Sequence, residues 1–220
     1  PLVHQFILAL LYIPVVIISF INSNPFEGLE ILQFLALLRS PAYATALTVI
    51  ARIVSVVMAL GLIYFIYKSA RELFNEKTAL FSAAIIALNP VINANAHTAK
   101  VDLPFIFWGV VSLYYLIRAI KYDEKKSFIY TAIFACLSFG SKDQGYAIFV
   151  LPFIFYFFIY PFLISERDGI TKTKIFTKNF IYFIIVFILS TIIVENVIFN
   201  WSGLVKRFIL LTGENSKRAI

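Results

Sequence analysis

Residues 44–67 read ATALTVIARIVSVVMALGLIYFIY, a run whose one charged residue is Arg52. About 20 apolar residues in an α-helix cross the hydrocarbon core of a bilayer, so this run is long enough to span one. The run ends at Lys68, the first of several cations that follow it. Residues 44–67 therefore predict a transmembrane helix, and the apolar stretches on either side can be compared with it.

Six further apolar stretches flank this helix. They are residues 2–21, 78–92, 103–120, 127–141, 144–164 and 179–199. The chain of 220 residues is 61% hydrophobic and only 14% charged, whereas a soluble domain carries about 25% charged residues. This composition excludes a soluble globular domain and an enzyme domain outside the membrane. We predict an all-α fold, a polytopic transmembrane helix bundle with amphipathic juxtamembrane helices near the N-terminus.

The basic residues are distributed as in a membrane protein. Eleven of the 19 Lys and Arg residues lie in three loops, residues 68–77, 118–126 and 167–178. Loops rich in Lys and Arg stay in the cytoplasm, so these three loops are predicted to be cytoplasmic. The alternate loops hold few cations and are predicted to be external. The net charge of +7 thus points to a lipid bilayer as partner, and no nucleic acid is expected.

The sequence predicts three parts. Residues 1–43 form external juxtamembrane helices, or one span and a surface helix, because residues 29–38 combine apolar and charged side chains as interfacial helices do. Residues 44–199 form the transmembrane bundle, and residues 200–220 form an external tail. The one cysteine, Cys136, lies in an apolar stretch, so neither a disulfide framework nor a cysteine metal site is expected.

Two of the apolar stretches, residues 78–92 and 127–141, are short for a span. A helix of about 15 residues covers only about 22 Å of a hydrocarbon layer about 30 Å thick. Irregular backbone below the membrane surface must line a wet cavity or be covered by protein. We therefore expect loops 93–101 and 141–143 to face one external pocket.

Asp102 is the candidate catalytic residue of this pocket. It precedes a strongly apolar stretch, with Pro104 two residues further on. A carboxylate at the start of a helix meets free backbone N–H groups, so one interpretation is a helix cap. The other interpretation is a carboxylate held over the pocket, where it binds a divalent metal ion or orients a substrate hydroxyl.

Four cationic or titratable residues are candidates for binding substrate in the same pocket. Lys142 lies between two stretches joined by almost no linker, and ionisable groups at such depth usually face a cavity or each other. The alternative is that Lys142 and Asp143 extend to the interface from a simple turn. The other three candidates are His97, Lys100 and Arg52. A lipid-linked phosphate suits a pocket with these groups, because a phosphate leaving group needs cations.

Several short motifs resemble the phospholipid-carrier-dependent glycosyltransferases, relatives of the protein O-mannosyltransferases and aminoarabinose transferases in the GT-C class. In chain order they are the proline-leucine pair at residues 1–2, IARIVS at 50–55, YKSARELF at 67–74, AHTAKVDLP at 96–104, FW at 107–108, SKDQG at 141–145 and LP at 151–152. The resemblance extends over residues 1–164, and the order and spacing of the motifs make it specific.

The resemblance implies an enzyme that transfers one sugar from a polyprenyl-phosphate donor to a protein, lipid or glycan acceptor. It places Asp102 in the active site, with a divalent metal ion as the one cofactor, and Lys142 near the carrier phosphate. His97 falls where the family has a polar residue facing the pocket. The family's principal catalytic carboxylate precedes the proline-leucine pair, so the chain by itself is expected to be inactive. The membrane is the plasma membrane of a prokaryote or the endoplasmic reticulum membrane of a eukaryote.

Two other classes of protein share the composition. A transporter or flippase is favoured by paired interrupted helices and an internal inverted repeat, and the sequence shows no such repeat. A structural subunit of a membrane complex needs Asp102 only as a helix cap.

Overall fold

The computed structural model describes residues 2–23, 31–142, 145, 147–155, 178–196 and 201–212, and within these residues all regular structure is helical. The helices are α1 (Leu2–Asn22), α2 (Ile31–Leu38), α3 (Pro41–Leu73), α4 (Glu76–Ala87), α5 (Pro90–Ala96), α6 (Asp102–Tyr122), α7 (Lys125–Ser141), α8 (Ala147–Ile154), α10 (Lys178–Val194) and α11 (Trp201–Thr212). The all-α prediction is confirmed.

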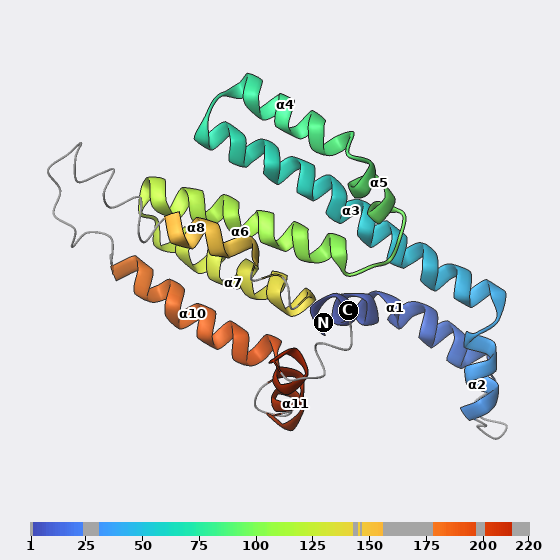
Figure 1. Cartoon of the computed structure of the whole chain (residues 1–220). Helices are drawn as coiled ribbons and strands as arrows, with labels where there is room; N and C mark the ends of the chain where they lie inside the picture. The colour runs from blue at the N-terminus through green and yellow to red at the C-terminus, as the bar shows by residue number, and fades with distance from the viewer. Residues whose placement is uncertain are drawn as a thin grey trace, which may run out of the picture.

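The helices α3, α6, α7 and α10 lie side by side, with α6 packed between α3 and α7 (Figure 1). Among the described residues, three helices are long and apolar enough to cross a membrane, namely Val3–Asn22, Pro41–Leu73 and Asp102–Tyr122. The pair α4 and α5 passes the same test as one broken span. The chain is an integral membrane protein.

The stretch at residues 78–92, expected as one short span, is divided between α4 and α5, which meet at an angle of 60°. The break follows from Asn89 and Pro90. The Asn89 side chain accepts hydrogen bonds from Val91 N and Ile92 N, and Pro90 is suited to the first turn of a helix, where its missing N–H costs nothing. The Asn93 amide donates to the Ala87 carbonyl at 3.1 Å. Backbone groups on both sides of the break therefore have hydrogen-bond partners.

The pair α6 and α7 packs closely through small and polar residues. Ser112 donates to the Thr131 carbonyl at 2.8 Å, and Ser138 donates to the Phe105 carbonyl at 2.8 Å. A Cβ atom at Gly109 would lie 2.6 Å from the end of the Ile148 side chain and 3.2 Å from the Ser138 hydroxyl, so the helices approach closely here. Such residues let helices approach where the hydrophobic effect cannot drive them together. The expected short helix at residues 127–141 is seen as α7, Lys125–Ser141.

One end of the bundle, which we call the basic end, holds residues 67–78 and 114–127. Here α3 and α6 finish and α4 and α7 begin (Figure 1). Three ion pairs join these segments: Lys121 to Glu72 at 3.2 Å, Arg118 to Glu124 at 3.3 Å and Arg71 to Glu76 at 3.1 Å. Two of the loops predicted to be cytoplasmic therefore meet at one end.

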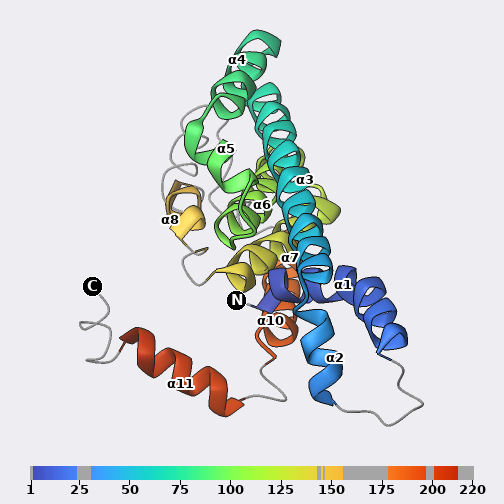
Figure 2. The same ribbon diagram turned by 90° about the vertical axis from the view of Figure 1, so that its right-hand side faces the viewer.

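The opposite end, which we call the Asp102 end, holds loop 97–101, the start of α6 and the end of α7. The helix α1 packs there against α3 and α7, and α2 follows it (Figure 2). The α2 helix corresponds to the amphipathic segment predicted at residues 29–38. The division at residues 43 and 199 stays a prediction.

Candidate functional site

Asp102 and Lys142 form an ion pair at the Asp102 end. The Lys142 Nζ atom donates to Asp102 Oδ1 at 2.5 Å, across 40 residues of sequence. The Asp102 side chain is 35% exposed and the Lys142 side chain 32% exposed. The pair thus joins the start of α6 to the residue after α7, and solvent or a ligand can still reach it.

The Asp102 carboxylate does not cap its helix. Asp102 is the first residue of α6, and the capping position belongs to Val101, which makes no side-chain cap hydrogen bond. Pro104 lies buried in the first turn, as its position in the sequence predicted. Asp102 is thus an acidic residue in the first turn of α6, and its carboxylate accepts a hydrogen bond from Lys142.

Lys142 is held in place by the turn that ends α7. Its backbone N–H donates to the Ser138 carbonyl, and its own carbonyl accepts from Gly145 N at 2.8 Å. A side chain at position 145 would bring its Cβ within 2.8 Å of the Ser138 carbonyl oxygen, so the turn needs glycine. The Lys142 ammonium also lies 5.3 Å from the centre of the Phe105 ring, an attractive cation–π contact. Asp143 lies outside the described residues.

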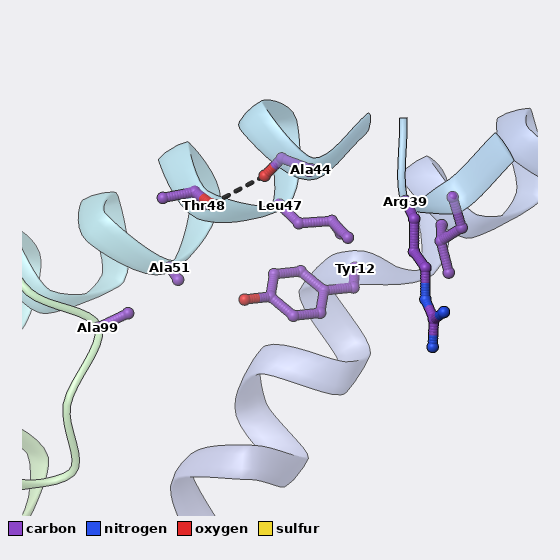
Figure 3. Close-up of a pocket in the computed structure, with 8 residues that line it drawn as sticks. Tyr12, Arg39, Ala44, Leu47, Thr48, Ala51 and Ala99 are labelled. Atoms are coloured by element: carbon purple, nitrogen blue, oxygen red, sulfur yellow. Dashed lines mark hydrogen bonds between the residues drawn. The ribbon is translucent and has the colours of Figure 1, made fainter. Parts of the chain in front are cut away.

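A hollow of about 510 Å³ opens between α1, α3 and loop 97–101 (Figure 3). Its walls are mostly apolar, and the Tyr12 ring of α1 lies across it, facing α3. The lining residues are Tyr12, Leu38, Arg39, Ala44, Leu47, Thr48, Ala51 and Ala99. The hollow therefore combines apolar surface with two hydroxyl groups and one guanidinium group.

Arg52 lines a second hollow of about 360 Å³ next to the first. The two hollows share Ala44 and Thr48 of α3. Arg52 is exposed and forms no ion pair with any described residue. Its charge is therefore available to an anionic group that enters from this side of α3.

His97 and Lys100 lie exposed on loop 97–101. Within the part of the chain that the structure describes, neither side chain forms a hydrogen bond or an ion pair with Asp102 or Lys142. The loop itself is fixed to α3, because the Ser55 hydroxyl donates to the Thr98 carbonyl at 3.1 Å. The structure thus brings Asp102 and Lys142 together and places the other three candidates around the neighbouring hollows and loop.

Comparison with known proteins places this site in a family. A family model described as dolichyl-phosphate-mannose-protein mannosyltransferase matches residues 42–199. The chain belongs to this family. The matched region of this mannosyltransferase family member runs from the start of α3 past the end of α10, so it includes the Asp102–Lys142 pair and loop 97–101.

An uncharacterized protein of Aquifex aeolicus (strain VF5) is 31% identical over 120 residues, which are 54% of this chain and 23% of that protein. The chain thus spans under a quarter of the length of that relative. No solved structure matches this family member.

The residues around the ion pair do not by themselves fit a metal ion. No group of three or more His, Cys, Asp and Glu residues gathers in the described segments of this mannosyltransferase family member. The Asp102 carboxylate is also already bound by Lys142. Because a bound cation needs several ligands, we derive no chemical step through a metal at Asp102.

Sequence reasoning missed Tyr12, Arg39 and Ser55. Tyr12 and Ser55 lie inside apolar runs, where nothing in the pattern separates a residue that lines a hollow from one that faces lipid. Arg39 gave a usable signal, because it is a cation directly before the α3 span on the side predicted to be external.

Proposed function

We propose that the protein is part of a membrane glycosyltransferase of the GT-C class. It transfers a sugar from a polyprenyl-phosphate donor to a hydroxyl-bearing acceptor on the non-cytoplasmic face. The observation that carries this proposal is the Asp102–Lys142 ion pair. It sits at the end of the bundle opposite the basic loops, inside the region that matches the mannosyltransferase family.

The chemistry of such a transfer needs the groups found at this end. The bond between the sugar carbon and the carrier phosphate breaks, and the acceptor oxygen takes the place of the phosphate. The departing phosphate takes the electrons of the broken bond and gains a negative charge, which a fixed cation such as Lys142 stabilises. The acceptor hydroxyl must lose its proton to a base, and Asp102 supplies a carboxylate that orients this hydroxyl. In the absence of substrate, the two side chains neutralise each other.

The neighbouring hollows supply further binding groups. Arg52 and Lys100 are exposed and carry charges that no described carboxylate neutralises, so either can contact the phosphate. His97 offers a hydrogen bond to the sugar from the same loop. The apolar walls between α1 and α3 suit the first part of a polyprenyl chain, since burial of apolar surface is favourable there.

The acceptor is a protein, a lipid or a glycan, and the membrane is a prokaryotic plasma membrane or the endoplasmic reticulum membrane. The family description supports a protein acceptor. The concentration of Lys and Arg in the loops at the basic end supports a non-cytoplasmic Asp102 end.

The decisive experiment replaces Asp102 by Asn in the complete protein and measures sugar transfer from a polyprenyl-phosphate donor. We expect a fall in kcat of about 100-fold, because a misplaced reacting group can lower a rate by about that factor. Asp123→Asn is the matched control, because Asp123 follows the last residue of the same helix. Its backbone adopts the left-handed conformation, which Asn tolerates equally well. Equal transfer by both variants would refute the proposal.

A transporter or flippase is the second candidate, and the 60° break between α4 and α5 favours it. Interrupted helices line the substrate path of many transporters. Movement of a fluorescent polyprenyl-phosphate lipid between leaflets of reconstituted vesicles tests this function. Transfer of sugar without movement of the lipid supports the transferase, and the opposite result supports the transporter.

A further inference from the structure

Ser55 lies in the middle of α3, with its side chain completely buried. Its hydroxyl oxygen lies 3.1 Å from the carbonyl of Thr98 and 3.2 Å from the carbonyl of Ala51, one turn earlier in the same helix. A hydroxyl has one proton, so it must divide that proton between the two acceptors. The second acceptor, Thr98, belongs to loop 97–101 and lies 43 residues away in sequence.

We infer that Ser55 is a positioning residue for the sugar transfer proposed above. It holds loop 97–101 against α3 and thereby fixes the direction from which Asp102 faces its substrate. The inference rests on the proposed function for its catalytic consequence, while the hold on the loop can be measured independently of catalysis.

The loop has little freedom to absorb a displacement at Thr98. The Thr98 N–H and hydroxyl both bond to the Asn95 carbonyl, at the end of α5. On the other side, only three residues separate Thr98 from Asp102, where α6 begins. A shift of the Thr98 carbonyl is therefore passed on to the start of α6 and to the Asp102 carboxylate.

The same contact lies beside the first hollow. Ala51 and Ala99 line one edge of this hollow (Figure 3), one turn before Ser55 and one residue after Thr98. Arg52 lies three residues before Ser55 on α3. The Ser55 hydrogen bond thus sets the distance between the groups carried by α3 and those carried by loop 97–101.

The two partners of this hydrogen bond differ in burial. Ser55 is completely buried, and Met58 on the next turn of α3 belongs to an apolar cluster with Ala96 and Leu103, whereas Thr98 is half-buried. Without the Ser55 hydroxyl, the Thr98 carbonyl loses its partner, and the loop can move until water supplies a new one. A displacement of about 1 Å in a catalytic group can lower a rate about 100-fold.

The test uses Ser55→Ala in the full protein, with Ser112→Ala as matched control. Ser112 is equally buried and also donates to a carbonyl of another helix, Thr131 at 2.8 Å, but it lies between α6 and α7 and away from the loop. We expect Ser55→Ala to lower kcat about tenfold while KM changes less than about threefold. Ser112→Ala should leave both constants within about twofold of the parent.

Amide hydrogen exchange over residues 97–105 provides the readout that does not depend on catalysis. Exchange there should become about tenfold faster in Ser55→Ala and remain unchanged in Ser112→Ala. Ser55→Cys has a side chain of similar shape with a weaker hydrogen-bond donor. Its kcat and its exchange rate should lie between those of the parent and Ser55→Ala, and it replaces Ser55→Ala in the test if that variant does not fold.

Equal behaviour of the Ser55 and Ser112 variants would overturn the inference. If Asp102→Asn keeps full activity while loop exchange still responds to Ser55, the proposed function fails and the hold on the loop stands.

Discussion

The two ends of the bundle use charged side chains differently. At the basic end, Glu72, Glu76 and Glu124 each pair with a cation on another segment or across a turn. At the Asp102 end, the described residues form one ion pair, and exposed cations such as Arg52 and Lys100 have no carboxylate partner. The carboxylates of the basic end therefore fix helix ends, and exposed cations there such as Lys77 and Lys126 also form no ion pair with a described residue. The Asp102 end differs because its unpaired Arg52 lines a hollow that an anionic ligand can enter.

Burial differs between pairs rather than between ends. The Arg71–Glu76 pair is more than half exposed on both sides, whereas the Lys121–Glu72 pair, at 47% and 21% exposed, is buried about as much as the Asp102–Lys142 pair. Exposed pairs contribute roughly 0 to 1 kcal/mol to stability. Removing one member of a more buried pair leaves an uncompensated charge and has a larger effect. Substitutions at the two ends should therefore differ mainly in kind, with sugar transfer affected at the Asp102 end and stability at the basic end.

The largest effect is expected from Lys142→Met, compared with Lys121→Met at the basic end. Loss of a cation that stabilises the departing phosphate should lower kcat about 100-fold to 1,000-fold. Lys121 pairs with Glu72 far from the ligand, so its loss should change kcat by less than about twofold. Steady-state transfer assays on equal amounts of folded protein measure both. A matching loss in the two variants would show that Lys142 acts only as a structural partner of Asp102.

Gly145→Ala should produce the next largest effect, by displacing Lys142 without removing it. The new methyl group would lie 2.8 Å from the backbone oxygen of Ser138, which cannot move aside without unwinding the end of α7. Overpacking of this kind costs about 1 to 3 kcal/mol. Gly109→Ala is the comparison, because its methyl group meets the flexible end of Ile148. Thermal unfolding in detergent should show the larger loss at Gly145, and equal losses would contradict the tight turn.

The fold was largely predictable from the apolar runs, but its break was not. The apolar run at residues 44–67 correctly predicted the helix α3. The observed helix, Pro41–Leu73, is longer than the run at both ends. It begins at Pro41, which is favoured in the first turn, and it continues beyond the last residue of the apolar run. The division between α4 and α5 was missed because residues 78–92 are apolar throughout except for Thr78, Ser82 and Asn89. Asn89 followed by Pro90 indicates a turn, but the prediction of one continuous helix followed from the length of the apolar run.

The proximity of Asp102 and Lys142 was predictable for a topological reason. Because the predicted spans alternate in direction, residues 93–101 and 141–143 were expected on the same side of the membrane. This expectation put Asp102 and Lys142 in the same region, but it did not predict that their side chains are in contact. The hydrogen bond from Ser55 to Thr98 could not be predicted, because a serine within an apolar run gives no sign of which neighbour it faces. Contacts between helices depend on their rotation about their own axes, and the sequence pattern fixes that rotation only coarsely.

Arg52→Gln should have a moderate effect that appears in KM. Arg52 is exposed beside the second hollow and forms no ion pair with a described carboxylate. If it contacts the donor phosphate in both the bound and the transition state, its loss raises KM about tenfold with little change in kcat. Arg71→Gln is the control, since Arg71 pairs with Glu76 at the basic end. A fall in kcat at constant KM would instead place Arg52 at the reacting atoms.

Glu72→Gln should have the smallest effect, although Glu72 makes more contacts than Asp102. Its carboxylate accepts hydrogen bonds from Lys121 at 3.2 Å and from the Tyr122 hydroxyl at 2.9 Å, and a glutamine oxygen can still accept one of them. Lys121 also donates to the Glu72 backbone carbonyl at 2.9 Å, a contact that the substitution leaves intact. We expect a loss of less than about 1 kcal/mol, seen as a fall in Tm of about 1 to 3 °C, with sugar transfer unchanged. A fall in kcat comparable to that of Asp102→Asn would mean that the basic end takes part in the reaction, and the division of roles between the two ends would then be untenable.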